Sequence, residues 1–161
     1  MNKIMKSLKI SCLVLLAVLL TSCFAKEKTF TKGDITITLT NQFKEIDGGD
    51  FEMAYASNKY GFSAIGNDKS ALNVSSLHAY TELVLSNAQR EGLTIQEYKD
   101  DQQTFEYVCY TAEVEGKTYG YMTVSKEGKN KYYTLNFWCF EKNFDSSKDQ
   151  FIEWAKSAKV A

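Results

Sequence analysis

The chain has 161 residues, a formal net charge of −1 and 44% hydrophobic residues. This hydrophobic content, together with 14% aromatic residues, excludes a disordered chain and suits one ordinary folded domain. The near-neutral charge and the lack of a basic stripe exclude a nucleic-acid-binding protein. Proline is absent. This suits a strand-rich domain with tight turns, although a low-proline composition bias explains it equally well.

Residues 1–22 have the layout of a secretory signal peptide. Three lysines come first, an apolar stretch over residues 10–20 follows, and Leu20-Thr21-Ser22-Cys23 ends the segment. These last four residues resemble the lipobox of bacterial lipoproteins. In that family the cysteine thiol receives a diacylglyceryl group and the chain is cut just before it. The resemblance implies that Cys23 is lipidated and that lipid, palmitate included, anchors the protein to a membrane of the bacterial cell envelope.

Two other interpretations of this segment remain open. A retained transmembrane anchor would need about 20 apolar residues, and residues 10–20 supply only about half that number. Small residues before Cys23 also suit the ordinary signal peptidase, which would secrete the protein without lipid. The aspartate that favours inner-membrane retention in enteric bacteria is missing, since Phe24 stands there. The location therefore stays open between the periplasmic side and the outer membrane.

Cleavage before Cys23 would leave 139 residues with 16 basic and 20 acidic side chains, a net charge of −4. We expect residues 23–28 to form the lipidated cysteine and a short tether that reaches at most about 17 Å. Residues 29–161 are then a single domain, which is long enough to bury a core without disulfides. Its negative charge indicates that the lipid, rather than basic side chains, provides the membrane contact.

Alternation of apolar and polar residues predicts most of the domain to be strands, and a period of three to four predicts two helices. Ser75 or Ser76 would cap the first helix and Ser146 or Ser147 the second. Turns are expected at residues 32–34, 58–59, 115–116 and 127–130. The predicted strands are 29–31, 35–39, 51–57, 60–65, 93–98, 104–114, 119–125 and 131–140, and the predicted helices are 76–91 and 145–159.

A two-residue turn at Glu115-Gly116 would pair Cys109 with Met122, and the next turn would pair Met122 with a residue near Leu135. This register places Cys139 two strands from Cys109, more than 9 Å away by strand spacing alone. That separation exceeds the usual limit of about 7 Å for a disulfide. We therefore predict that both cysteines are free thiols, even in an oxidising compartment.

The same registers divide the last three long strands into two faces, both rich in apolar residues. Either helices cover both faces, which is the more common arrangement, or one face is a surface for a partner. Tyrosine suits interfaces because it offers contact area and a hydroxyl group. The candidate binding residues on the tyrosine-rich face are Tyr110, Tyr119, Tyr121, Tyr132 and Trp138.

The order of elements resembles the PsbP-like fold, which the Mog-type nuclear import factors and many small bacterial lipoproteins share. The resemblance rests on Ile35-Thr36-Ile37-Thr38-Leu39, on Ser76-Leu77-His78-Ala79-Tyr80 and on the closing stretch 151–159. It implies an α+β fold, an antiparallel sheet of about seven or eight strands with helices packed on its faces. The proline-tryptophan feature found after the first strand of many members is missing, since Asn41-Gln42-Phe43 stands there. No catalytic residues belong to the family as a whole.

Residues for catalysis or metal binding are few. His78 is the only histidine, so a zinc site or a serine-histidine triad would depend on it alone. The loop carboxylates of Asp47, Asp50, Asp100 and Asp101 do not have EF-hand spacing, and solvated turn residues are the simpler interpretation. We expect no enzyme, no cofactor and no metal.

The leading hypothesis is a non-enzymatic, lipid-anchored protein that binds a protein partner or assists an assembly through the tyrosine-rich face. The first alternative is a small-ligand-binding lipoprotein with a pocket between sheet and helix. The second alternative is an envelope enzyme that uses loop carboxylates.

Overall fold

The computed structural model describes residues 25–161, so the predicted signal peptide and Cys23 lie outside the described part of the chain. The domain has an α+β fold, as the resemblance implied, but its antiparallel strands form two sheets rather than the single sheet expected. Its elements are β1 (Glu27–Lys32), β2 (Ile35–Thr40), β3 (Lys44–Glu45), β4 (Met53–Ala56), β5 (Tyr60–Asp68), the 3-10 turn η1 (Lys69–Ala71), α2 (Leu77–Asn87), β6 (Gln96–Lys99), β7 (Thr104–Val114), β8 (Lys117–Glu127), β9 (Lys131–Phe140), α3 (Glu141–Ser157) and β10 (Lys159–Val160).

The main sheet has seven strands in the order β3-β4-β5-β9-β8-β7-β6, and every neighbouring pair is antiparallel. Its longest hairpin, β7–β8, turns at Glu115 and Gly116, which have φ angles of 51° and 74°. Two positive φ angles in a two-residue turn match the right-handed twist of the strands they join. The turn therefore sets the register of the hairpin, and Cys109 lies opposite Met122 as predicted.

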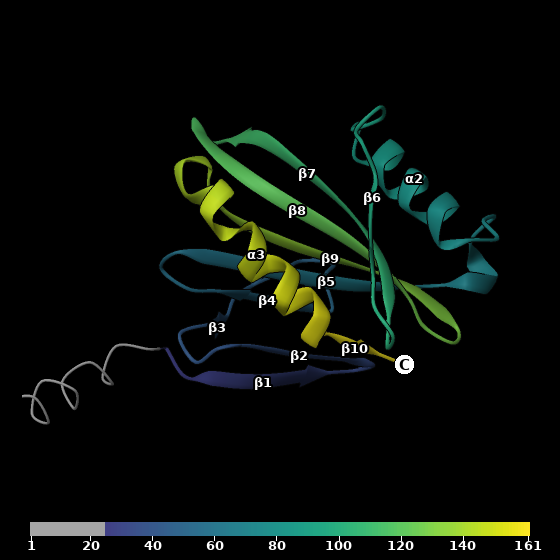
Figure 1. Ribbon diagram of the computed structural model, residues 1–161, viewed down its shortest axis with the longest axis horizontal. Helices are drawn as coiled ribbons and strands as arrows, with labels where there is room; N and C mark the ends of the chain where they lie inside the picture. The colour runs from purple at the N-terminus through teal and green to yellow at the C-terminus, as the bar shows by residue number, and fades with distance from the viewer. Residues whose placement is uncertain (1–24) are drawn as a thin grey trace, which may run out of the picture.

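The first hairpin does not join the main sheet. Strands β1 and β2 form a separate three-stranded sheet with β10, the last two residues before the C-terminal alanine. Strand β1 begins at Glu27, so Glu27 and Lys28 of the expected tether are part of a strand. Figure 1 shows this small sheet alongside α3, and Ser157 Oγ joins the two by accepting from Thr38 N and donating to Thr38 O, both at 3.1 Å.

Helix α2 begins as the sequence predicts. The side chain of Ser76 accepts a hydrogen bond from Ala79 N at 3.1 Å, which satisfies one of the free amides of the first turn. The left-handed backbone of Gln89 (φ 55°) follows the last turn. It lets Arg90 N donate to Leu85 O at 2.7 Å, so the chain folds back under the helix end.

Helix α3 begins four residues before the predicted start, and the predicted caps are wrong. Ser146 and Ser147 lie inside the helix, where their hydroxyls donate to Asn143 O. The cap position is Phe140, which contributes no side-chain hydrogen bond. Phe144, buried in the first turn, explains the early start, because its ring lies directly over Gly120 of β8. Packing on the sheet therefore overrides the local capping signal.

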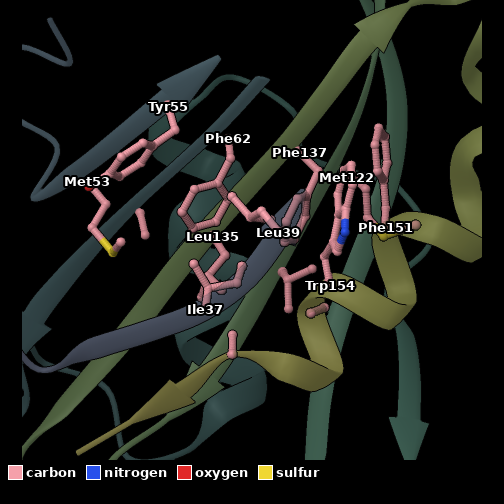
Figure 2. Close-up of a cluster of buried hydrophobic side chains, with 14 of the residues drawn as sticks. Ile37, Leu39, Met53, Tyr55, Phe62, Met122, Leu135, Phe137, Phe151 and Trp154 are labelled. Carbon is pink, nitrogen blue, oxygen red and sulfur yellow. The ribbon is translucent and has the colours of Figure 1, made fainter. Parts of the chain in front are cut away.

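The core lies between the main sheet on one side and α3 with the small sheet on the other. Phe137 packs on Phe151 and Trp154 with ring centroids 5.7 and 6.2 Å apart. Figure 2 shows these rings side by side with Ile37 and Leu39 of β2, which are fully buried. Strand β2 and helix α3 thus both contribute residues to the core.

The two cysteines within residues 25–161 are free thiols, as predicted. The register of the β8–β9 pair differs by two residues from the expected one. Met122 lies opposite Phe137 rather than near Leu135. Cys139 therefore lies opposite Gly120, still two strands away from Cys109. Burial raises the pKa of both thiols, which makes them less reactive than an exposed cysteine.

Candidate ligand pocket

Three of the five aromatic candidates form a row across the main sheet. Tyr110 of β7 lies opposite Tyr121 of β8, and Tyr121 lies opposite Trp138 of β9. The two tyrosine rings are stacked with centroids 5.4 Å apart, and the Tyr121 and Trp138 rings are 6.3 Å apart. We call these three residues the aromatic row.

The row extends over the next strand because that strand has a glycine at the right position. Gly61 of β5 lies opposite Trp138, and a Cβ atom at Gly61 would be only 1.9 Å from Cε2 of the indole. The indole therefore lies flat across the β5 backbone, where any larger residue would displace it.

A pocket of about 580 Å³ opens between the aromatic row and the C-terminal half of α2. This volume is within the range of about 300–1,000 Å³ that small-molecule sites occupy. Helix α2 supplies Val84 and Leu85, and the loop before β4 supplies Phe51, which is 40% exposed. The complete lining is Phe51, Ser63, Ile65, Asn67, Val84, Leu85, Asn87, Ala88, Arg90, Tyr110, Tyr121, Thr123, Thr134, Asn136 and Trp138.

A ladder of polar side chains crosses the floor of the pocket beside the aromatic row. Thr123 Oγ1 is 3.3 Å from the Tyr110 hydroxyl and donates to Asn136 Oδ1 at 2.8 Å. Asn136 Nδ2 donates in turn to Ser63 Oγ at 3.4 Å. One polar group from each of four neighbouring strands thus faces the pocket, and these groups can exchange their mutual hydrogen bonds for bonds to a ligand.

A second polar group lies at the end of the pocket nearer the start of α2. The hydroxyl of Tyr80 accepts from Asn67 Nδ2 and is 2.8 Å from Thr134 Oγ1. Burial raises the pKa of this tyrosine, which stays neutral at physiological pH. The Tyr80 ring also stacks on Tyr132 at 4.9 Å, so this contact fixes α2 to the sheet.

Arg90 is the only charged residue in the pocket lining. The turn after α2 directs it back towards the sheet, and its guanidinium carbon lies 5.3 Å from the centre of the Tyr110 ring. Burial raises the pKa of the nearby Tyr121 hydroxyl, while the charge of Arg90 acts in the opposite direction. The arginine therefore adds a cation at one end of an otherwise uncharged pocket.

The structure places the other two aromatic candidates outside the pocket. Tyr132 is only 3% exposed beneath α2 and belongs to the packing of that helix. Tyr119 stacks on Phe140 at 5.0 Å near the far end of the sheet. The tyrosine-rich face is thus partly covered by α2 and partly open.

Sequence reasoning missed Arg90 and the polar ladder. Thr123 and Asn136 interrupt the apolar face on which Tyr121 and Trp138 lie, and this interruption was the available signal. The sequence signal for Arg90 was weaker, because no local pattern shows that the side chain of a residue after a helix will lie against the sheet.

The loop carboxylates have local structural roles. Asp100 accepts hydrogen bonds from Gln102 N, Gln103 N and the Tyr98 hydroxyl, and the bond from Gln102 is the main cause of its lowered pKa. Asp47 accepts from Gly49 N at 3.0 Å. Within residues 25–161, no three His, Cys, Asp or Glu side chains gather closely enough to hold a metal ion.

No protein-family profile and no curated protein matches the sequence. Several solved structures nevertheless have a similar fold. Cyanobacterial PsbP (CyanoP) from Synechocystis sp. PCC 6803 has a TM-score of 0.61 at 13% identity, covering 88% of this chain and 96% of that one. The Saccharomyces cerevisiae Ran-binding protein Mog1p has a TM-score of 0.56 at 12% identity, covering 85% and 96%.

A crystal structure from Bacteroides thetaiotaomicron has a TM-score of 0.60 at 10% identity. That match covers 86% of this chain and 49% of the other. Identities this low establish a shared fold and leave activity open. The fold is therefore PsbP-like, as the element order implied. No helix of residues 25–161 has the length and apolar character needed to cross a bilayer.

Proposed function

We propose that this protein is a lipid-anchored, non-enzymatic binding protein of the bacterial envelope, and that it binds a small ligand in the pocket under α2. The observation that carries the proposal is the pocket itself. It combines an aromatic floor with converging polar side chains, which is the usual composition of a small-molecule site. The name of the fold neighbour Mog1p, a Ran-binding protein, supports a binding role in general.

The site can be tested with a neutral fluorescent probe, N-phenyl-1-naphthylamine. The first described element, β1, begins at Glu27, so a Cys23→Ser chain without residues 1–22 retains every element of the pocket. Without a lipid it also needs no detergent. Ala88→Trp would fill the mouth of the pocket, because Ala88 is exposed and lines it. Glu82→Trp places the same ring on an exposed position of α2 outside the lining and is the matched control.

We expect the probe to bind the unaltered pocket and the Glu82→Trp variant, and to bind Ala88→Trp much more weakly. Equal binding by both tryptophan variants would mean that the probe lies elsewhere. No binding at all would remove the basis for a small-ligand site.

The anchor is proposed from the lipobox-like Leu20-Thr21-Ser22-Cys23. Three residues separate Cys23 from Glu27, the first residue of β1, so the domain would lie within about 14 Å of the lipid. Cells grown with labelled palmitate should label the wild-type protein and the Cys12→Ser variant, but leave Cys23→Ser unlabelled. An unlabelled wild-type protein, or one that keeps its leader, would rule out the anchor.

A protein partner is the second candidate, and the exposed Phe51 at the pocket mouth favours it. A photo-crosslinking residue at position 51, introduced in cells, would distinguish the two. A discrete crosslinked protein that Ala88→Trp abolishes would support the partner, whereas its absence together with probe binding would support the small ligand.

A further inference from the structure

The charge distribution of the pocket restricts the chemistry of its ligand. Arg90 is the only arginine of the whole chain, and none of the residues that line the pocket is acidic. This contrasts with the composition of residues 23–161, where acidic side chains outnumber basic ones by 20 to 16. A cation in a pocket wall of otherwise neutral residues attracts an anion.

The guanidinium of Arg90 has no hydrogen-bond or ion-pair partner among residues 25–161. Its contact is with the face of the Tyr110 ring, at 5.3 Å. The guanidinium forms no ion pair with the neighbouring Glu91, whose Oε1 accepts a hydrogen bond from Ser86 Oγ at 3.1 Å. Stacking on an aromatic ring orients a guanidinium while its five N–H donors stay available. Arginine in this arrangement suits a carboxylate, phosphate or sulfate group.

The rest of the pocket suits a flat or apolar body. The aromatic row forms its floor, and Val84, Leu85 and Ile65 contribute to its lining. Rings stack well on tyrosine and tryptophan, and the polar ladder can hydrogen-bond to a hydroxyl or carbonyl group on the ligand. The cation and the stacking surface meet at Tyr110, so one molecule can use both.

We infer that the ligand is a small amphipathic anion, with an aromatic or apolar body on the aromatic row and an acidic group on Arg90. This inference rests on the proposed pocket and adds the ligand class to it. It also assigns Arg90 as the residue that determines specificity.

The test compares two probes that differ in one acidic group, N-phenyl-1-naphthylamine and 1-anilinonaphthalene-8-sulfonate. Both are titrated into the same Cys23→Ser chain used above. We expect the sulfonate to bind about tenfold or more tightly than the neutral amine, as a charge-assisted hydrogen bond allows. Ala88→Trp should weaken both probes, which would place them in the pocket.

Arg90→Gln should remove most of the preference for the sulfonate and change binding of the neutral probe by less than about twofold. Arg90→Lys keeps the charge without the planar fork, so it should retain part of the preference. Lys99→Gln removes an exposed charge of β6 outside the pocket and is the matched control for net charge. Its binding of both probes should equal that of the unaltered chain.

Equal affinity for the two probes, unaffected by Arg90→Gln, would overturn the anionic ligand and leave the pocket as a site for neutral ligands. Failure of both probes to bind would overturn the ligand class and the proposed small-ligand site together. Loss of sulfonate preference in Lys99→Gln as well as in Arg90→Gln would show a general charge effect and would also overturn the role of Arg90.

Discussion

His78 and Glu106 form the most unusual charged pair of the domain. Glu106 has a side chain only 12% exposed, and its Oε1 lies 2.9 Å from His78 Nδ1. Its other oxygen, Oε2, is buried without a hydrogen-bond partner among residues 25–161. A buried carboxylate is costly unless it is paired. His78, the second residue of α2, therefore provides the charged partner that this buried carboxylate needs.

This pair predicts a pH dependence. The hydrogen bond to Glu106 is the main cause of the raised pKa of His78, whose ordinary value is 6.5. Because the pKa of His78 is higher in the folded than in the unfolded protein, the protonated histidine stabilises the fold. This stabilisation is fully present below pH 6.5 and is lost as the pH rises through the pKa that His78 has in the folded protein. We expect the free energy of unfolding to fall across that interval.

Because His78 is the only histidine, its ring protons can be followed without ambiguity in a proton NMR titration. Glu106→Gln should return the pKa towards 6.5. Glu82→Gln is the matched control, since Glu82 lies 3.7 Å from Nε2 and at the surface, and it should shift the pKa much less. An unshifted pKa in Glu106→Gln would contradict the pairing.

Gly61 gives a second prediction at the scale of one residue. Gly61→Ala would place its Cβ against the Trp138 indole and should destabilise the domain by about 1–3 kcal/mol, as overpacking usually does. In a Trp138→Ala background the ring is absent and the cost should largely disappear. Urea unfolding of the four proteins measures this coupling. An equal cost in both backgrounds would show that the indole does not lie over Gly61.

At the scale of elements, the end of α3 depends on a buried lysine from another strand. Lys126 of β8 is only 5% exposed, and its Nζ donates to Ala155 O, Ala158 O and Gln103 Oε1 at 2.6–2.9 Å. These carbonyls are among the groups that a helix end leaves unpaired. Burial lowers the pKa of Lys126 to about 8, so the amine is mostly charged at pH 7.

Lys126→Met should therefore destabilise the domain by about 2–4 kcal/mol at pH 7, because it removes three hydrogen bonds and leaves the Ala158 carbonyl without a donor, while Ala155 O keeps its bond from Ala158 N. Chemical unfolding measures the change, and faster hydrogen exchange at the end of α3 would locate it. Lys156→Met removes a surface pair with Glu153 and a contact of the ammonium group with the Tyr98 ring at 5.7 Å, and should cost less than about 1 kcal/mol. Similar costs for the two variants would argue against the capping role.

At the scale of the whole molecule, the stability of the domain comes from packing without a disulfide. One face of the main sheet buries its aromatic side chains under α3 and the small sheet, as Figure 2 shows. The other face is covered only in part, by α2. The first face therefore provides the core, and the second leaves the pocket open beside α2.

The absence of a disulfide is directly measurable. Cys109 and Cys139 are free within the described chain, so the Cys23→Ser protein without residues 1–22, unfolded without reductant, should take up two alkyl groups in a mass measurement. The same protein reduced first is the control and should give the same mass. A bridged peptide, or a mass increase that appears only after reduction, would contradict the strand register.

The sequence by itself determined the elements whose signals are local. Alternation predicted β9 with its observed bounds, the Glu115-Gly116 turn predicted the pairing of Cys109 with Met122, and the capping preference of serine predicted the start of α2. Period, turn type and cap each depend on a few consecutive residues, so they can be read before folding is considered.

Only the tertiary structure decided the features that depend on contacts between distant segments. Packing of Phe144 on Gly120 set the start of α3, and pairing with Ile35 and Thr36 made a strand of the last residues. The pocket likewise required α2, Arg90 and the aromatic row to meet. No local sequence pattern predicts these tertiary contacts, because they depend on which surfaces the folded chain brings together.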